Sequence, residues 1–112
     1  MLYDITELRS LFGDDVSSFN ELMENFVADS LASSDSIDAA CISGDQATIK
    51  TELHKFNGMV GTMHIVSIEK MLKNIEREIN ESGLNEKNIT TIQFITTTIR
   101  EIAAEIVNEL KK

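Results

Sequence analysis

Apolar residues recur every three or four positions along most of the chain, which is the spacing of one face of an α-helix. The clearest examples lie in the second half. One face comprises Ile65, Ile68, Leu72, Ile75 and Ile79, and the other comprises Ile92, Ile95, Ile99, Ile102, Ile106 and Leu110. Isoleucine favours strands, but a helical spacing kept over many turns outweighs that weak propensity. The pattern predicts two long amphipathic helices, separated by a break at Ser82-Gly83.

The first half of the chain predicts three further helices. A short one, capped by Asp4, runs to about Phe12, and the sequence at 13–15 (GDD) supplies a stop and a new cap. A long helix follows from about Val16 to Ile42, with a polar stretch at 32–36 where a kink could form. Its apolar face comprises Val16, Phe19, Met23, Phe26, Ser30, Ile37, Ala40 and Cys41. The next helix begins after 43–45 (SGD), and its apolar face comprises Ile49, Leu53, Phe56 and Val60.

The arrangement expected from these elements is a single all-α domain over residues 1–112. The chain has no proline, five glycines and no linker-like segment, which favours long unbroken helices. Four long amphipathic helices joined by short turns pack most simply as an antiparallel up-down four-helix bundle. The short additional N-terminal helix would then lie as a lid at one end. The core would be filled by the methionines together with Phe12, Phe19, Phe26 and Phe56.

Composition restricts the function. The 112 residues include 10 Lys and Arg against 19 Asp and Glu, a formal net charge of -9. Such a surface repels nucleic-acid phosphates and anionic lipids, so we expect neither nucleic acid nor membrane contact, and the charge favours a monomer. The single cysteine, Cys41, has no internal disulfide partner, and neither a secretory signal nor an apolar run of about 20 residues is present. These features predict a cytoplasmic protein.

One histidine in the helix that follows Asp45 is predicted to face away from the core. On a wheel of about 100° per residue, His54 lies about 130° from the centre of the apolar stripe. Lys50 and Asn57 lie on the core-ward side of His54, and Gly58 and Gly61 lie close beside it. We therefore expect an exposed or half-exposed imidazole in the middle of a helix.

The two glycines need an explanation, because each costs about 1 kcal/mol relative to alanine inside a helix. They could let a neighbouring helix approach, or begin the turn at Thr62, and for Gly61 this reading stays open. Gly58 points away from the apolar stripe, where a bare surface would let a bulky partner reach the imidazole of His54. A neutral imidazole is nucleophilic near pH 7, so it can accept a phosphoryl group and pass it to a carboxylate.

The segment 54–65 (HKFNGMVGTMHI), followed by Ile68, Leu72 and Ile75-Glu76, resembles the characteristic motif of the histidine phosphotransfer family. The upstream segment 11–15 (LFGDD), leading into Leu22, Phe26 and Asp29, is similar to the opening helices of that family, and Gly44-Asp45 precedes the histidine helix at the usual distance. The resemblance covers essentially the whole chain.

This resemblance implies a phosphoryl carrier of a two-component phosphorelay, without an ATP site or enzymatic activity of its own. His54 would accept a phosphoryl group from a receiver-domain aspartate and pass it to another receiver. The partners would be response-regulator receiver domains, which also bring the magnesium ion, so no cofactor is expected in this chain. Two origins stay open for this cytoplasmic chain: a free-standing protein, or the carboxyl-terminal domain cut from a hybrid sensor kinase of the inner membrane. We favour the excised domain.

The chain departs from the family pattern at two positions. Asn57 stands where the family commonly has lysine; it can donate a hydrogen bond to a phosphoryl oxygen but brings no charge. Lys50, one turn before His54, could supply that charge, whereas Lys55 lies about 100° round the helix and is expected at the rim of the contact. His64 stands where the family commonly has glycine. With no third ligand at a suitable spacing, His54 and His64 do not predict a metal site.

A second interpretation is a helical adaptor or structural bundle that binds receiver domains without accepting phosphate. The residues that distinguish the two are His54 and Gly58, because an adaptor needs neither a nucleophile nor clearance around it. The binding residues predicted for the carrier are Lys50, Lys55, Asn57, Gly58 and Gly61.

Overall fold

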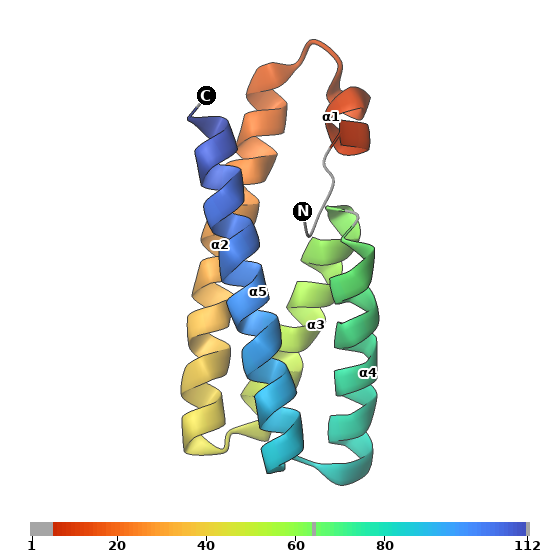
Figure 1. The fold of residues 1–112 in the computed structure, drawn as a ribbon, viewed down its shortest axis with the longest axis vertical. Coiled ribbons are helices and arrows are strands. Elements are labelled where there is room, and N and C mark those ends of the chain that lie inside the picture. The colour runs from red at the N-terminus through yellow and green to blue at the C-terminus, as the bar shows by residue number, and fades with distance from the viewer. Residues whose placement is uncertain (1–5, 64, 112) are drawn as a thin grey trace.

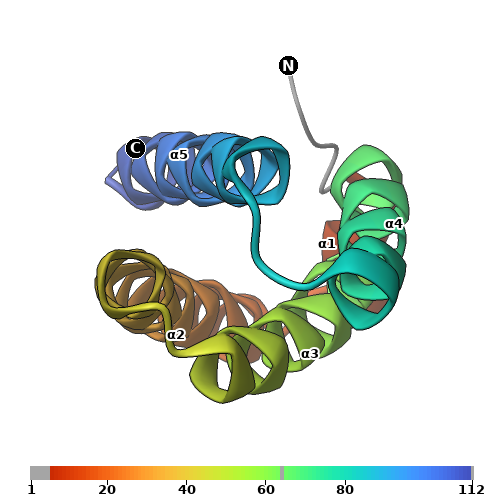
Figure 2. The same cartoon turned by 90° about the horizontal axis from the view of Figure 1, so that it is seen from below.

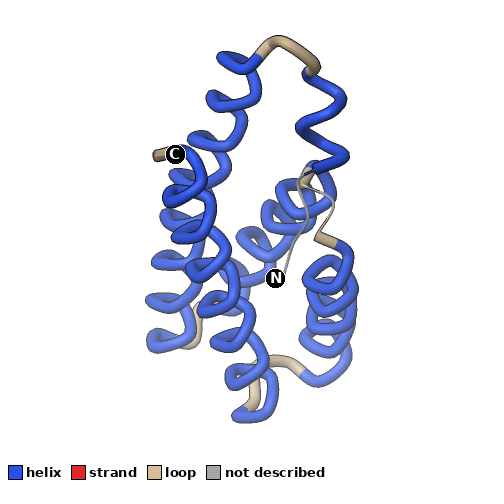
Figure 3. Tube along the Cα trace, turned by 45° about the horizontal axis from the view of Figure 1, so that its top comes forward, coloured by secondary structure: helices blue, strands red, loops and turns tan. Residues whose placement is uncertain are grey.

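The computed structural model describes residues 6–63 and 65–111, and all regular structure in this part of the chain is helical (Figures 1 and 3). The helices are α1 Thr6–Phe12, α2 Val16–Ser43, α3 Gln46–Thr62, α4 Val66–Ser82 and α5 Glu86–Leu110. The all-helical fold is thereby confirmed, and α2 continues unbroken through its polar stretch. The predicted cap Asp4 and the residue His64 lie outside the described residues.

Two aspartates begin the long helices of the first half, as predicted. The Oδ1 atoms of Asp15 and Asp45 accept hydrogen bonds from the backbone N–H groups of Ser18 and Thr48, each at 3.1 Å. The side chains and backbones of Ser18 and Thr48 lower the pKa of Asp15 and Asp45, because these hydrogen bonds favour the ionised carboxyl. Gly44 ends α2 with a φ of 75°, a conformation that glycine adopts without strain.

Each long helix contacts two others. α2 packs against α3 and α5, and α4 packs against the same two helices, so the four surround one core (Figure 2). The apolar faces predicted for α3 and α4 are entirely buried, as is that of α5 except for the half-buried Leu110. Val16 was expected in the core but is 61% exposed. The pattern is misleading there because the start of α2 extends beyond the ends of α3 and α4 (Figure 1).

Helix α1 lies at one end, against α2. The rings of Phe12 and Phe19 meet edge to face with their centres 5.7 Å apart. The guanidinium carbon of Arg9 lies 5.0 Å from the centre of the Phe19 ring, within the range of a cation–π contact. Aromatic contacts with the first buried ring of α2 therefore hold α1 in place.

A polar cluster joins α2 and α5. Arg100 contacts Asp35 at 2.8 Å and Asp38 at 2.6 Å, and the Thr96 hydroxyl donates to Asp38 at 3.0 Å. Hydrogen bonds to the two carboxylates raise the pKa of Arg100, because they favour the charged guanidinium. Asp35 and Asp38 lie at and just after the polar stretch of α2. Part of that stretch therefore serves a helix–helix contact.

Arg100→Met should lower the free energy of unfolding by about 1 kcal/mol, since it leaves Asp38 without its ion pair. The loss stays modest because Arg100 and Asp38 are 34% and 35% exposed, so solvent screens the pair. Urea denaturation measures the change. Lys73→Met is the matched control, because among the described residues Lys73 pairs with Glu69 of its own helix. Equal losses in both variants would contradict a special role for the α2–α5 cluster.

Candidate functional site

The imidazole of His54 is exposed in the middle of α3, as predicted. Its position follows from the opposite face of the helix, where four side chains are completely buried: Ile49, Leu53, Phe56 and Val60. No described residue forms a hydrogen bond or ion pair with the His54 side chain. The ring nitrogens are therefore free to react with a group that arrives from outside the chain.

Neither glycine near His54 is required by the fold. α3 runs through Gly58 and Gly61 to Thr62, and neither residue has a positive φ. A Cβ atom added at either position would meet no atom of its described surroundings within 4 Å. The explanation that a neighbouring helix approaches closely is therefore wrong for both glycines. The cost of Gly58 in helix stability has no compensation within the described chain, whereas Gly61 lies in the last turn of α3, where its carbonyl accepts a hydrogen bond from the N–H of Met63.

Asn57 lies on the side of α3 that faces α4. Its side chain is half-buried, and its Nδ2 atom donates a hydrogen bond to Oε1 of Glu76 on α4. On the helical wheel, Lys50 and His54 lie on this same side, and both are exposed. The structure thus places Lys50, His54 and Asn57 along one flank of α3. Glu76 belongs to the segment that resembles the family motif, but it was not predicted as a site residue.

The other flank of α3 borders a groove shared with α2. Lys55 forms an ion pair with Glu52 at 3.3 Å and lines this groove, whose volume is about 630 Å³, together with Asp29, Gly58 and Met59. A smaller hollow of about 130 Å³ adjoins it through Asp29 and Met59 and has a mainly apolar lining. Lys55 therefore lies on the groove side of α3, away from Lys50 and Asn57. Gly58 borders the same groove.

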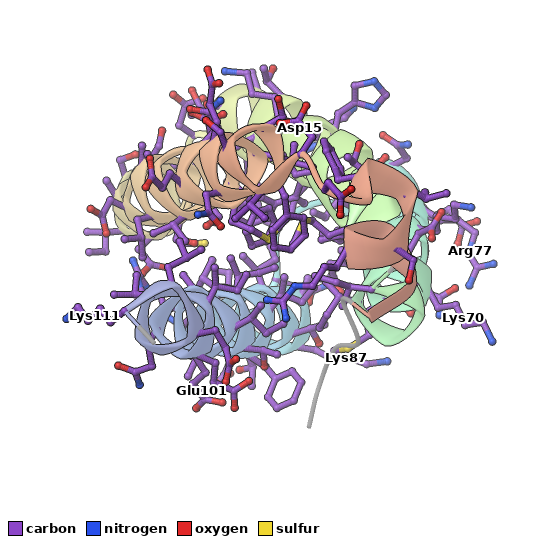
Figure 4. All side chains as sticks on the ribbon, turned by 90° about the horizontal axis from the view of Figure 1, so that it is seen from above. Asp15, Lys70, Arg77, Lys87, Glu101 and Lys111 are labelled. Atoms are coloured by element: carbon purple, nitrogen blue, oxygen red, sulfur yellow. The ribbon has the colours of Figure 1, made fainter. Side chains whose placement is uncertain are left out.

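The two helices beside α3 differ in charge. α2 contains five acidic residues and no basic ones, whereas α4 carries Lys70, Lys73 and Arg77 among its acidic residues. Figure 4 shows Lys70 and Arg77 projecting outward from α4. Of the two helices beside α3, α4 therefore carries much less net negative charge than α2.

The described residues contain no group of three or more His, Cys, Asp or Glu side chains that could hold a metal ion. None of the described helices has the length and apolar character needed to cross a membrane. No protein-family model, curated protein or solved structure matches the chain. The function is therefore inferred from the site and from the resemblance of the segment 54–65.

Gly58→Ala should raise the free energy of unfolding by about 0.5–1 kcal/mol, because the added methyl group has room and alanine favours the helix. Urea denaturation measures the change. Gly44→Ala is the matched control: with a φ of 75° that position should lose about 1–2 kcal/mol. Destabilisation by Gly58→Ala would show that the fold does require this glycine.

Proposed function

We propose that this chain is a histidine phosphotransfer domain, in which His54 accepts a phosphoryl group from a receiver aspartate and passes it to a second receiver. The observation that carries the proposal is the exposed imidazole of His54 beside Gly58 and Gly61, two helical glycines for which the described chain has no packing use. The resemblance of the segment 54–65 to the family motif supports the same conclusion. In this proposal the protein is a cytoplasmic, monomeric carrier rather than an enzyme.

The proposal includes an antiparallel up-down four-helix bundle formed by α2–α5. The connections support it, because only residues 44–45, 63–65 and 83–85 separate successive long helices, and links this short favour antiparallel neighbours. The contacts support it as well, since each long helix packs against two others. In Figure 1 the direction of the chain alternates from each long helix to the next.

The transfer step uses one ring nitrogen of neutral His54. Its lone pair attacks phosphorus of the receiver acyl phosphate, a nitrogen–phosphorus bond forms, and the phosphorus–oxygen bond to the aspartate breaks. The aspartate leaves as a carboxylate, while the second ring nitrogen of His54 keeps its proton. Charge is conserved, and the magnesium ion that stabilises the phosphoryl oxygens belongs to the receiver. The second transfer reverses these events with another receiver.

The surroundings of His54 suit a protein as the phosphoryl donor. Gly58 and Gly61 give clearance, so the catalytic face of a receiver can reach the ring. The groove between α2 and α3 borders Gly58 and offers the half-buried Met59 for docking, and the smaller hollow beside it adds the half-buried Leu22. Lys50, exposed one turn before His54, supplies the positive charge that Asn57 lacks. Lys55 contributes at the rim of the interface.

One observation favours the adaptor as the second candidate. The residue at the usual lysine position is Asn57, and Glu76 already accepts a hydrogen bond from its side chain. An adaptor would use the groove between α2 and α3 to bind receivers and leave His54 unmodified. Phosphotransfer, rather than binding, separates the two candidates.

Incubation with a panel of phosphorylated receiver domains should label the native chain with phosphate that is stable in base and labile in acid, as expected for phosphohistidine. His54→Gln should remain unlabelled, because it keeps a side chain of similar size but has no nucleophilic nitrogen. Binding of both proteins to the unphosphorylated receivers is the control. Receivers that bind the native chain without labelling it would favour the adaptor.

Gly58→Leu tests the clearance directly. We expect transfer from a phosphorylated receiver to slow roughly hundredfold, because the new side chain displaces the incoming protein. Labelling of His54 by phosphoramidate, a small phosphoryl donor, should be unaffected because it needs no such clearance. Equal slowing with both donors would instead point to damage at the histidine itself.

A further inference from the structure

The hydrogen bond between Asn57 and Glu76 leaves the amide oxygen of Asn57 without a partner, like two other buried side-chain oxygens among the described residues, those of Ser34 and Asn88. Nδ2 of Asn57 donates to Oε1 of Glu76, and the residues lie 19 positions apart on α3 and α4. Oδ1 of Asn57 is buried, and no donor from the described chain reaches it. A buried carbonyl oxygen without a partner destabilises a fold, and such atoms are rare in native proteins. The orientation of this amide therefore needs a cause.

The carboxylate of Glu76 provides that cause. An ionised carboxylate only accepts hydrogen bonds, so it selects the nitrogen of the Asn57 amide and excludes the oxygen. Turning the amide by half a turn would place Oδ1 against the negatively charged oxygen of Glu76. The pair therefore fixes Asn57 as a hydrogen-bond donor, although its oxygen is left unsatisfied.

The position of Asn57 gives this orientation a use. Asn57 lies three residues after His54, a spacing that makes side chains neighbours on a helix surface, about 5–6 Å apart at Cβ. Its Nδ2 atom carries two hydrogens, of which Glu76 takes one. The second can be donated to another acceptor. A phosphoryl group on His54 would bring three strong acceptor oxygens to this flank of the helix.

We propose that Glu76 is a positioning residue, which holds the Asn57 amide as a hydrogen-bond donor to the phosphoryl group on His54. The proposal rests on the proposed phosphotransfer function and adds a residue of α4 to it. Glu76 makes no contact with phosphate itself and transfers no proton. It acts through the amide, which stands between the glutamate and the phosphoryl group.

Phosphoramidate provides a test that needs no receiver. In the full chain, phosphorylation of His54 should move the side-chain NH₂ resonances of Asn57 in a nitrogen–proton correlation spectrum. In Glu76→Gln the movement should be lost, because a glutamine can donate to Oδ1 of Asn57 and no longer selects the nitrogen. Glu78→Gln is the matched control: it removes the same charge from the same helix, but Glu78 lines the hollow between α4 and α5. A movement that persists in Glu76→Gln would overturn the proposal.

Transfer rates supply the second arm. Glu76→Gln should accept phosphate from a phosphorylated receiver roughly tenfold more slowly than the native chain. The transfer rate of Glu78→Gln should be unchanged. The urea midpoint of Glu76→Gln should be no lower than that of the native chain. In an Asn57→Ala background the same substitution should change the rate less than about twofold, because Glu76 acts through Asn57. An equal loss of transfer rate in the native and Asn57→Ala backgrounds would contradict a role of Glu76 that depends on Asn57. If no receiver labels the native chain, the proposed function fails, whereas the phosphoramidate spectra still decide the role of Glu76.

Discussion

The rotation of α3 about its own axis determines which side chains the candidate site exposes. Four completely buried side chains, Ile49, Leu53, Phe56 and Val60, fix that rotation against the core. Because each residue turns the helix by about 100°, any other rotation of α3 would expose part of this stripe. The exposure of His54, the contact of Asn57 with α4 and the open surface at Gly58 all follow from this constraint.

Three features that cost stability lie close together on α3, around His54. Gly58 and Gly61 weaken the helix without any packing benefit within the described chain, and Oδ1 of Asn57 is buried without a donor. Elsewhere the guanidinium of Arg100 pairs with Asp35 and Asp38, although Oγ of Ser34 and Oδ1 of Asn88 are also buried without a hydrogen-bond partner among the described residues. Departures from local rules that gather at one place are typical of functional sites, where stability is given up for access or orientation.

Much of the fold could be predicted from the sequence, because helical spacing and helix caps are local properties. The apolar faces of α3 and α4 and the caps Asp15 and Asp45 are examples. Val16 shows the limit: it continues the spacing of α2, but the spacing does not reveal where the neighbouring helices end. For the site, the exposure of His54 was predictable from α3 alone. The bond from Asn57 to Glu76 was not, because it depends on how α4 is aligned beside α3.

The most direct measurement locates the phosphoryl group on the chain after incubation with a phosphorylated receiver. Mass spectrometry of peptides does this, provided that the peptides are prepared at neutral to basic pH, where phosphohistidine survives. A single nitrogen–phosphorus modification on His54, with none on His64, is the result expected for a phosphoryl carrier built around the exposed face of α3. Phosphate on His64, on a serine or threonine, or on no residue would contradict it.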